Sequence, residues 1–237
     1  MRPGLKPGRN ALLLIGSPRG ARSTSNYLGV FLLGRLREYG VETRRLRIGD
    51  LAAVSTRGRL VATTLEADSV VLTTPLYVDS LPSPVIRALE LLAARLPERT
   101  SRARTQFAAI LNCAFPEARQ AENAVSICRL FAQEAGLRWA GGLTLGMGEA
   151  IGGRPLSRTG ATGRNVRRAL ELAAAALADG RPIPESAKEL MSQPLMPIWM
   201  YLWGARFGWY MRDRRQRGGR SLGARPYESC RCEEETR

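Results

Sequence analysis

Apolar runs with the length of β-strands alternate along most of the chain with segments in which apolar residues recur at helical spacing. The strand-like runs are Ala11–Gly16, Val41–Ile48, Ser69–Thr74, Phe107–Asn112 and Arg138–Leu145. The helical patterns cover Thr24–Tyr39, Pro82–Leu96, Glu117–Ala135 and Gly160–Ala178. Helices that connect consecutive strands make those strands parallel. The order predicts an α/β fold with a five-stranded, doubly wound parallel sheet, helices on both faces, and the arginine-rich run 41–48 at an edge.

The pattern changes after Gly180. We expect a short helix from about Glu185, followed by an aromatic stretch, Pro194–Met211, that holds three of the four tryptophans. From Arg212 onward the chain is rich in arginine and glycine and ends in an acidic run. This composition buries too little apolar surface to fold by itself. We therefore divide the chain into a main domain at 1–182, a helical extension at 183–215 and a tail at 216–237 that we expect to be disordered.

The formal net charge of +15 arises from 36 basic and 21 acidic residues. Strongly basic surfaces attract nucleic acids and anionic membranes. Here nearly all the basic residues are arginines, with Lys6 and Lys188 the only lysines, and they are scattered along the chain. This dispersion is typical of a coding bias, so we do not expect a nucleic-acid partner.

Histidine is absent, which excludes Ser-His-Asp catalysis and histidine-ligated zinc, and we expect no metal site. The four cysteines, Cys113, Cys128, Cys230 and Cys232, include no CxxC pair, and an even count alone does not make a disulfide framework in a chain of this size, so a reducing cytosol fits best. The apolar run 11–15 is too short for a signal-peptide core or a membrane span. We therefore expect a cytoplasmic protein.

Small and hydroxyl-bearing residues crowd the segment between the first strand and the first helix, Gly16 to Asn26. The N-terminus of a helix attracts anions through its unpaired N–H groups and its dipole, and hydroxyl and guanidinium groups add to this attraction. An ordinary capped helix after a tight turn is the alternative, but one capping hydroxyl would suffice for it. The pattern predicts a phosphate site formed by Ser17, Arg19, Ser23, Ser25 and Asn26, with Arg22 as the alternative to Arg19 for the positive charge.

Three phosphate-loop templates differ in how well they match this segment. The dinucleotide motif GxGxxG fails because Pro18 occupies the position of its second glycine. The nucleoside-triphosphate loop GxxxxGK[ST] fits better, but Ala21 and Arg22 replace its second glycine and its lysine. The third template fits best: Gly-Ser-Pro-Arg followed by Ser-x-Ser-Asn resembles the phosphate loop of the NAD(P)H-dependent FMN reductase group of flavodoxin-like proteins.

The loop after the third strand, Thr74 to Pro82, resembles the Pro-x-Tyr loop that surrounds the isoalloxazine ring in this family. A tyrosine offers a flat apolar face with a polar tip, and a proline stiffens the loop. An ordinary strand-to-helix turn would explain Pro82 alone. The resemblance implies ring contacts from Pro75, Leu76, Tyr77, Val78 and Asp79.

The segment after the fourth strand, Asn112 to Glu117, resembles the same family, and the likeness continues to Gly142. It implies that Asn112 hydrogen-bonds the ring edge, with Cys113 and Phe115 beside it. The N-terminus of a helix starting near Pro116 would stabilise negative charge on the reduced flavin. Cys113 is expected to fill space, because no base or redox partner accompanies it. Gly148, in the loop after the fifth strand, would border the ring or the substrate entrance.

The resemblance extends over about residues 11–180 and implies a flavodoxin-like fold, bound FMN, reduction by NADH or NADPH, and a homodimer. The predicted activity is that of an FMN-dependent oxidoreductase that passes electrons from NAD(P)H to a quinone, a flavin or another small acceptor. The flavin would carry the chemistry, so no catalytic side chain is required. Two alternatives are an FMN-binding electron carrier without NAD(P)H turnover and a P-loop-like nucleotide-binding enzyme.

The aromatic stretch 194–211 has two interpretations. Tryptophan and tyrosine beside arginine are typical of a helix that lies at a membrane interface. The same residues could instead dock on the main domain, on a second subunit or over the flavin, which would bury the tryptophans. At the level of sequence we favour docking, with peripheral membrane contact as the alternative.

Overall fold

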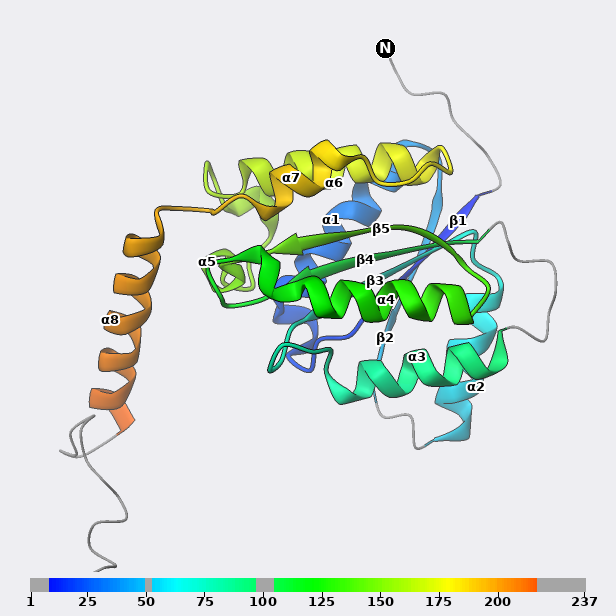
Figure 1. Ribbon diagram of the computed structural model, residues 1–237, viewed down its shortest axis with the longest axis horizontal. Helices are drawn as coiled ribbons and strands as arrows, with labels where there is room; N and C mark the ends of the chain where they lie inside the picture. The colour runs from blue at the N-terminus through cyan, green and yellow to red at the C-terminus, as the bar shows by residue number, and fades with distance from the viewer. Residues whose placement is uncertain (1–8, 50–52, 97–104, 217–237) are drawn as a thin grey trace, which may run out of the picture. The chain divides into compact units, whose positions relative to one another are not determined.

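A five-stranded parallel sheet forms the centre of the computed structural model, which describes residues 9–49, 53–96 and 105–216 (Figure 1). The strand order is β2-β1-β3-β4-β5, and every neighbouring pair is parallel. The predicted sheet and the edge position of the arginine-rich strand are thereby confirmed. The strands are β1 (Asn10–Ile15), β2 (Glu42–Arg47), β3 (Ser69–Pro75), β4 (Gln106–Asn112) and β5 (Arg138–Leu145).

Eight α-helices lie within the described residues. They are α1 (Thr24–Glu38), α2 (Val54–Leu65), α3 (Ser83–Arg95), α4 (Glu122–Glu134), α5 (Gly148–Ile151), α6 (Arg164–Ala178), α7 (Glu185–Ser192) and α8 (Ile198–Gln216). Helix α2 was not predicted, because it buries only Leu60 and Thr64 and so lacks a clear apolar stripe. The predicted helix at Glu117–Ala135 starts with a 3-10 turn, Ala118–Ala121, before α4 begins.

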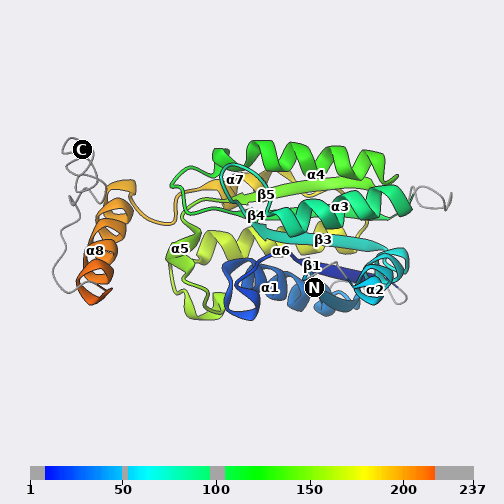
Figure 2. The ribbon, with the colours of Figure 1, turned by 90° about the horizontal axis from the view of Figure 1, so that it is seen from below.

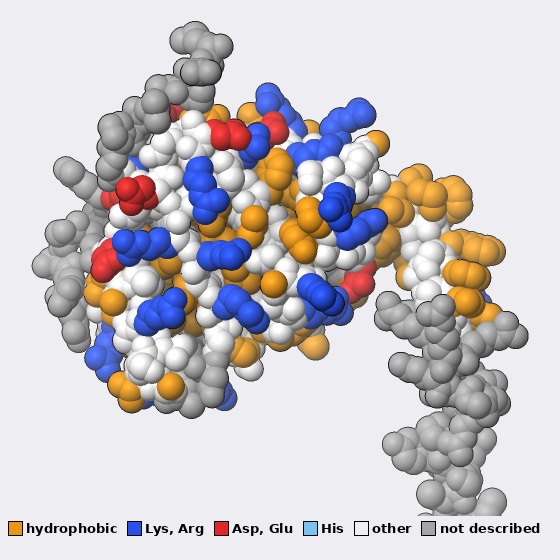
Figure 3. All heavy atoms as spheres, turned by 180° about the vertical axis from the view of Figure 1, so that it is seen from behind, with side chains coloured by type: hydrophobic (Ala, Val, Ile, Leu, Met, Phe, Trp, Pro, Cys, Tyr) orange, Lys and Arg blue, Asp and Glu red, His pale blue; other side chains and the backbone are white. Residues whose placement is uncertain are grey.

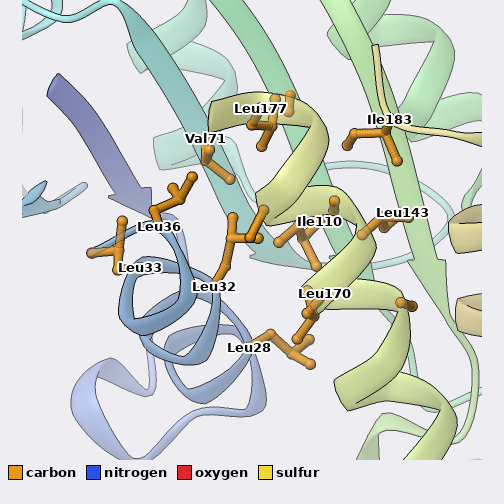
Figure 4. Packing of buried hydrophobic residues seen from close by; sticks show 14 of the residues in the cluster. Leu28, Leu32, Leu33, Leu36, Val71, Ile110, Leu143, Leu170, Leu177 and Ile183 are labelled. Carbon is orange, nitrogen blue, oxygen red and sulfur yellow. The ribbon is translucent and has the colours of Figure 1, made fainter. Parts of the chain in front are cut away.

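Helices lie on both faces of the sheet (Figure 2), and a hydrophobic core fills the space on each face. Alternate residues of each strand point to opposite faces, so Leu13 joins one core and Leu12 and Leu14 the other. Helices α2, α3 and α4 cover the second core, and α1, α6 and α7 the first. Figure 4 shows the first core, in which the sheet residues Val71, Ile110 and Leu143 meet leucines of α1 and α6, among them Leu28, Leu32, Leu170 and Leu177.

The chain divides into two compact units, Met1–Leu195 and Met196–Arg237. Helix α7 belongs to the first unit, because Ile183, Ala187 and Met191 are buried in its core. The division therefore falls after α7, whereas the sequence analysis placed it at residue 182 from the change in pattern. Helix α8 lies in the second unit, and the tail expected to be disordered lies outside the described residues except for Gln216.

Arginine and lysine side chains are spread over the face of the molecule in Figure 3, with fewer acidic side chains among them. This distribution agrees with the scattered arginines of the sequence. Among the described residues, no helix is long and apolar enough to cross a membrane.

Candidate functional site

The sheet topology brings the predicted loops to one edge. From β1 the chain crosses to β2 on one side, and the later strands β3, β4 and β5 add on the other side. In such sheets ligands bind outside the carboxyl ends of the strands at the point where the order reverses, here between β1 and β3. The loops after β1, β3 and β4 meet at this point, and the loop after β5 joins them.

Two of the predicted phosphate ligands hold the first loop in shape. The Ser23 hydroxyl accepts a hydrogen bond from the Asn26 amide at 3.1 Å and donates one to the Gly20 carbonyl at 2.7 Å. The Asn26 side-chain amide donates to the Ala21 carbonyl at 2.8 Å. Ser23 is thus the N-cap of α1. The capping interpretation is correct for Ser23, whose hydroxyl hydrogen is used by the Gly20 carbonyl, and Asn26 braces the loop with one of its two amide hydrogens.

Other groups of this loop remain for a ligand. The Ser17 side chain is buried, and its hydroxyl makes no hydrogen bond to the described residues. The Arg22 guanidinium has no ion pair within the described part of the chain. The backbone amides of Thr24 and Ser25 lie in the first turn of α1, where N–H groups have no partner within the helix. A hydroxyl, a guanidinium and two amides of this segment are therefore available to an anion.

Ser25 connects the first loop to the end of β4. Its hydroxyl donates to the Asn112 side-chain oxygen at 2.6 Å, and both residues are buried. The Asn112 carbonyl accepts from the Leu76 amide at 2.8 Å. Asn112 therefore connects the segments that follow β1, β3 and β4. The Ser25 hydroxyl positions Asn112 and does not remain free to bind a ligand.

The loop after β3 contains a tight turn with unusual backbone angles. Tyr77 and Ser80 exchange two backbone hydrogen bonds of 2.8 and 3.1 Å, and the central residues Val78 and Asp79 have φ values of 48° and 58°. A β-branched residue rarely adopts a positive φ, and the cost is of order 1–3 kcal/mol. Val78 is nonetheless 96% exposed, so core packing does not explain this conformation.

The predicted ring-contact residues divide by exposure. Tyr77, Val78 and Asp79 are exposed at the edge of the sheet, as is Phe115 of the loop after β4. Leu76 is buried in the second core, and Pro75 ends β3 with partial exposure. The apolar surface at this edge therefore comes from Tyr77, Val78 and Phe115, while Leu76 anchors the loop beneath it.

The loop after β4 holds Cys113 in a closed position. Its amide donates to the Leu145 carbonyl at 3.0 Å, and its thiol is buried near the carbonyls of Phe115 and Glu117. Burial raises the pKa of this thiol, the hydrogen bond with Phe115 lowers it, and the Glu117 and Asp79 carboxylates raise it further. The packing role predicted for Cys113 agrees with this environment. The helical segment predicted to start near Pro116 begins with the 3-10 turn Ala118–Ala121, and its α-helical part begins at Glu122.

We expect Cys113 and Cys128 to resist alkylation in the folded protein. Burial raises the pKa of Cys128 to about 12, so at pH 8 roughly one molecule in ten thousand carries this thiolate. The unfolded chain releases the proton near pH 8.5, so stability should fall as the pH rises above that value. Iodoacetamide labelling of a C230S/C232S variant, followed by mass spectrometry, checks the resistance to alkylation, and urea unfolding at pH 7.5 and pH 9.5 checks the loss of stability. Rapid labelling of Cys128 without unfolding would contradict it.

The loop after β5 packs closely on the first loop. The Gly148 amide donates to the Cys113 carbonyl at 2.7 Å, and the Gly148 carbonyl accepts from the Thr24 hydroxyl at 3.0 Å. A Cβ at Gly148 would lie 3.0 Å from the Cys113 carbonyl oxygen, so Gly148 permits a close backbone approach. Its two backbone hydrogen bonds join the loop after β5 to the loops after β1 and β4.

Three residues of this contact were missed by the sequence analysis. Thr24 binds the Gly148 carbonyl, Glu149 lies 3.3 Å from Arg19 in an exposed ion pair, and Gly153 packs against the Arg22 carbonyl. A Cβ at Gly153 would approach that carbonyl oxygen to 2.2 Å. The adjacent glycines Gly152 and Gly153 are a sequence signal for a close backbone approach. Glu149 has no such signal, because its partner Arg19 lies 130 positions away.

Comparisons with known proteins identify the fold. No protein-family model and no curated protein matches the sequence. Among solved structures, RosB with the bound intermediate 8-demethyl-8-formylriboflavin-5′-phosphate has a TM-score of 0.54 and 13% identity over 92% of each chain. A Streptococcus pneumoniae flavodoxin has a TM-score of 0.53 and 14% identity, covering 72% of this chain and 98% of its own. An FMN-dependent NADH-azoreductase from Bacillus anthracis, in complex with FMN, has a TM-score of 0.53 and 10% identity, with coverages of 72% and 100%.

These similarities define the class. The protein has a flavodoxin-like fold, as the sequence resemblance predicted, and its predicted site lies at the carboxyl edge of that fold. Identities of this size show the fold alone, so the ligand and the reaction are argued from the site.

Proposed function

We propose that the protein binds flavin mononucleotide at the carboxyl edge of its sheet and passes electrons from NADH or NADPH through the flavin to a small acceptor. The observation that carries this proposal is the pairing of two kinds of surface on adjoining loops. Groups available to an anion follow β1, and an exposed apolar surface follows β3 and β4. A ligand with a phosphate at one end and a flat aromatic ring at the other is complementary to these two surfaces.

The first loop fits the phosphate. The Ser17 hydroxyl and the first-turn amides of α1 donate hydrogen bonds, and Arg22 supplies positive charge, as does Arg19 once Glu149 is displaced. Ser23 and Asn26 keep the loop open in this shape without a ligand, which lowers the ordering cost of binding.

The second and third loops fit the ring. Tyr77, Val78 and Phe115 offer apolar surface, and Asn112 is fixed by Ser25 so that its remaining amide hydrogens can reach a ring edge. A bound flavin would supply hydride acceptance and release at N5. The chain's own residues bind and orient it, and the exposed rim leaves one side open to a small donor or acceptor.

The visible spectrum after addition of FMN tests this proposal. We expect a shifted and structured flavin band, weaker binding of riboflavin, which lacks the phosphate, and bleaching under anaerobic conditions with NADH or NADPH. Binding without bleaching would instead support an electron carrier. Failure to bind flavin, together with magnesium-dependent ATP or GTP binding, would replace the proposal with the P-loop alternative.

A second candidate function is chemical modification of the flavin itself. RosB was solved with a formylated flavin phosphate and matches 92% of this chain, a length that extends beyond Leu195, whereas the azoreductase matches 72%. Mass spectrometry of the flavin recovered after turnover separates the two candidates. An unchanged mass supports the reductase, and a changed mass supports modification.

Replacement of Val78 by asparagine is expected to stabilise the protein and weaken FMN binding. Asparagine tolerates a positive φ, so the variant should gain about 1 kcal/mol in the free energy of unfolding. It also removes apolar surface from the proposed ring contact. Urea unfolding and an FMN titration check both effects. The control V54N, at another exposed valine, should leave FMN affinity unchanged, and equal losses in both variants would contradict the assignment.

A further inference from the structure

Helix α8 carries the most exposed aromatic side chains of the described chain. Trp203 is 75% exposed, Trp199 68% and Phe207 64%. These three residues follow one another at intervals of four, so they share one face of the helix. Soluble proteins rarely leave such an aromatic face uncovered, which marks α8 as a binding surface.

Two glycines give α8 a strip without side chains. Gly204 and Gly208 directly follow Trp203 and Phe207, so this strip lies about 100° around the helix from the aromatic face. A Cβ at either glycine would meet nothing within 4 Å. The peptide groups of the strip can stay in water while the aromatic face leaves it.

The charge of the second unit indicates the kind of surface it meets. The last turns of α8 contain Arg212, Arg214 and Arg215 with a single acid, Asp213, and Arg206 is exposed within the aromatic segment. Clusters of arginine beside tryptophan and tyrosine favour the headgroups of anionic lipids. The net charge of +15 adds a long-range attraction to any anionic surface and opposes a second copy of the chain.

The length of the apolar segment sets how it would lie. Residues 198–211 span about 21 Å at 1.5 Å per residue, less than the roughly 30 Å hydrocarbon core of a bilayer. A helix of this length can lie in the interface with one face buried by about 5–10 Å. Arg206 can extend its guanidinium to the phosphates while its methylene groups stay in the apolar layer.

We propose that α8 is a membrane-binding helix that places the Trp199–Trp203–Phe207 face in the headgroup region of an anionic phospholipid surface. The partner is a lipid surface, and α8 lies on it without crossing. This inference rests on the second unit alone and is independent of flavin binding by the first.

The test uses the full chain in a W139F background, so that the remaining tryptophans are those of α8. Vesicles of phosphatidylcholine alone are compared with vesicles that also contain phosphatidylglycerol, and binding is measured by co-sedimentation. We expect binding to the anionic vesicles, a blue shift of the tryptophan emission, and quenching by lipids brominated on the acyl chains.

Two variants and a control separate the contributions. W199S/W203S/F207S should weaken vesicle binding by at least about tenfold, since it removes most of the buried aromatic area. R212Q/R214Q/R215Q should lose the preference for anionic vesicles, also by about tenfold or more. The control V54S/L130S changes two exposed apolar residues of the first unit and should bind as the parent does.

Three results would overturn the proposal. Anionic binding without quenching by brominated lipids would show that scattered arginines alone hold the protein to the vesicle. A change in mass by light scattering in the triple aromatic variant, without vesicle binding by the parent, would show that α8 contacts a second copy. Equal binding by parent and triple variant would also reject it, and far-UV circular dichroism of the same samples checks that the first unit is folded.

Discussion

Replacing Gly16 with alanine is expected to destabilise the protein and to weaken FMN binding. A Cβ at Gly16 would lie 2.4 Å from Cγ2 of Val85 and 2.9 Å from Oγ1 of Thr74. Val85 is buried in α3, so it cannot move aside freely. Overpacking of this kind costs about 1–3 kcal/mol. A shift of the first loop should also reduce FMN affinity by about tenfold, which is about 1.4 kcal/mol.

The control for this variant is Gly34 to alanine. Gly34 lies within α1, and a Cβ there would meet nothing within 4 Å. G34A should therefore raise stability by about 0.5–1 kcal/mol, because alanine favours the helix. The double variant G16A/V85A should recover part of the loss by making room. If G16A has the same free energy of unfolding and the same FMN affinity as the parent, the close approach of the loop to α3 does not determine the shape of the site.

Removing the hydrogen bond between Ser25 and Asn112 is expected to cost both stability and FMN affinity. Each single replacement by alanine leaves the other buried group without its partner, at a cost of about 1–3 kcal/mol. The double variant S25A/N112A should cost less than the sum of the two, since neither orphaned group remains. N112A should reduce FMN affinity more than S25A, because only Asn112 is proposed to touch the ring. Urea unfolding and FMN titration of the four proteins measure both effects.

Asn10 supplies the matched control. Its side chain donates to the Glu66 carbonyl at 2.8 Å and accepts from the Asp68 amide at 3.0 Å, at the amino end of the sheet. N10A should lower stability and leave FMN affinity unchanged. Equal effects of N10A and S25A on FMN affinity would mean that the Ser25 variant acts through general destabilisation. Additive losses in S25A and N112A would show that the two side chains do not act together.

The fold could be predicted from the sequence because its signals are local. Five apolar runs separated by helical patterns require parallel strands, and all five runs are strands within one or two residues. Helix α2 was missed, since a surface helix with two buried residues leaves little periodicity to detect. The start of α7 near Glu185 was predicted, but its place in the first unit was not, because Ile183, Ala187 and Met191 are too few to reveal that they join the core of that unit.

The site was predicted as a set of loops, and its internal roles were not. Ser23, Ser25 and Asn26 were grouped as phosphate ligands because they crowd a helix N-terminus. The structure gives them three separate tasks, namely a cap, a link to Asn112 and a loop brace. Sequence spacing cannot separate these tasks, because each depends on which distant group faces the side chain.

The sequence by itself determined the parallel sheet, the order of the loops and the absence of histidine chemistry, since these follow from residue type and local periodicity. The tertiary structure alone decided which polar groups remain open to a ligand. It joined Thr24 to Gly148, Arg19 to Glu149 and Ser25 to Asn112, and it forced Val78 into a positive φ. The physical reason is distance along the chain: hydrogen bonds between residues 87 to 130 positions apart form only when the strands set the loops side by side.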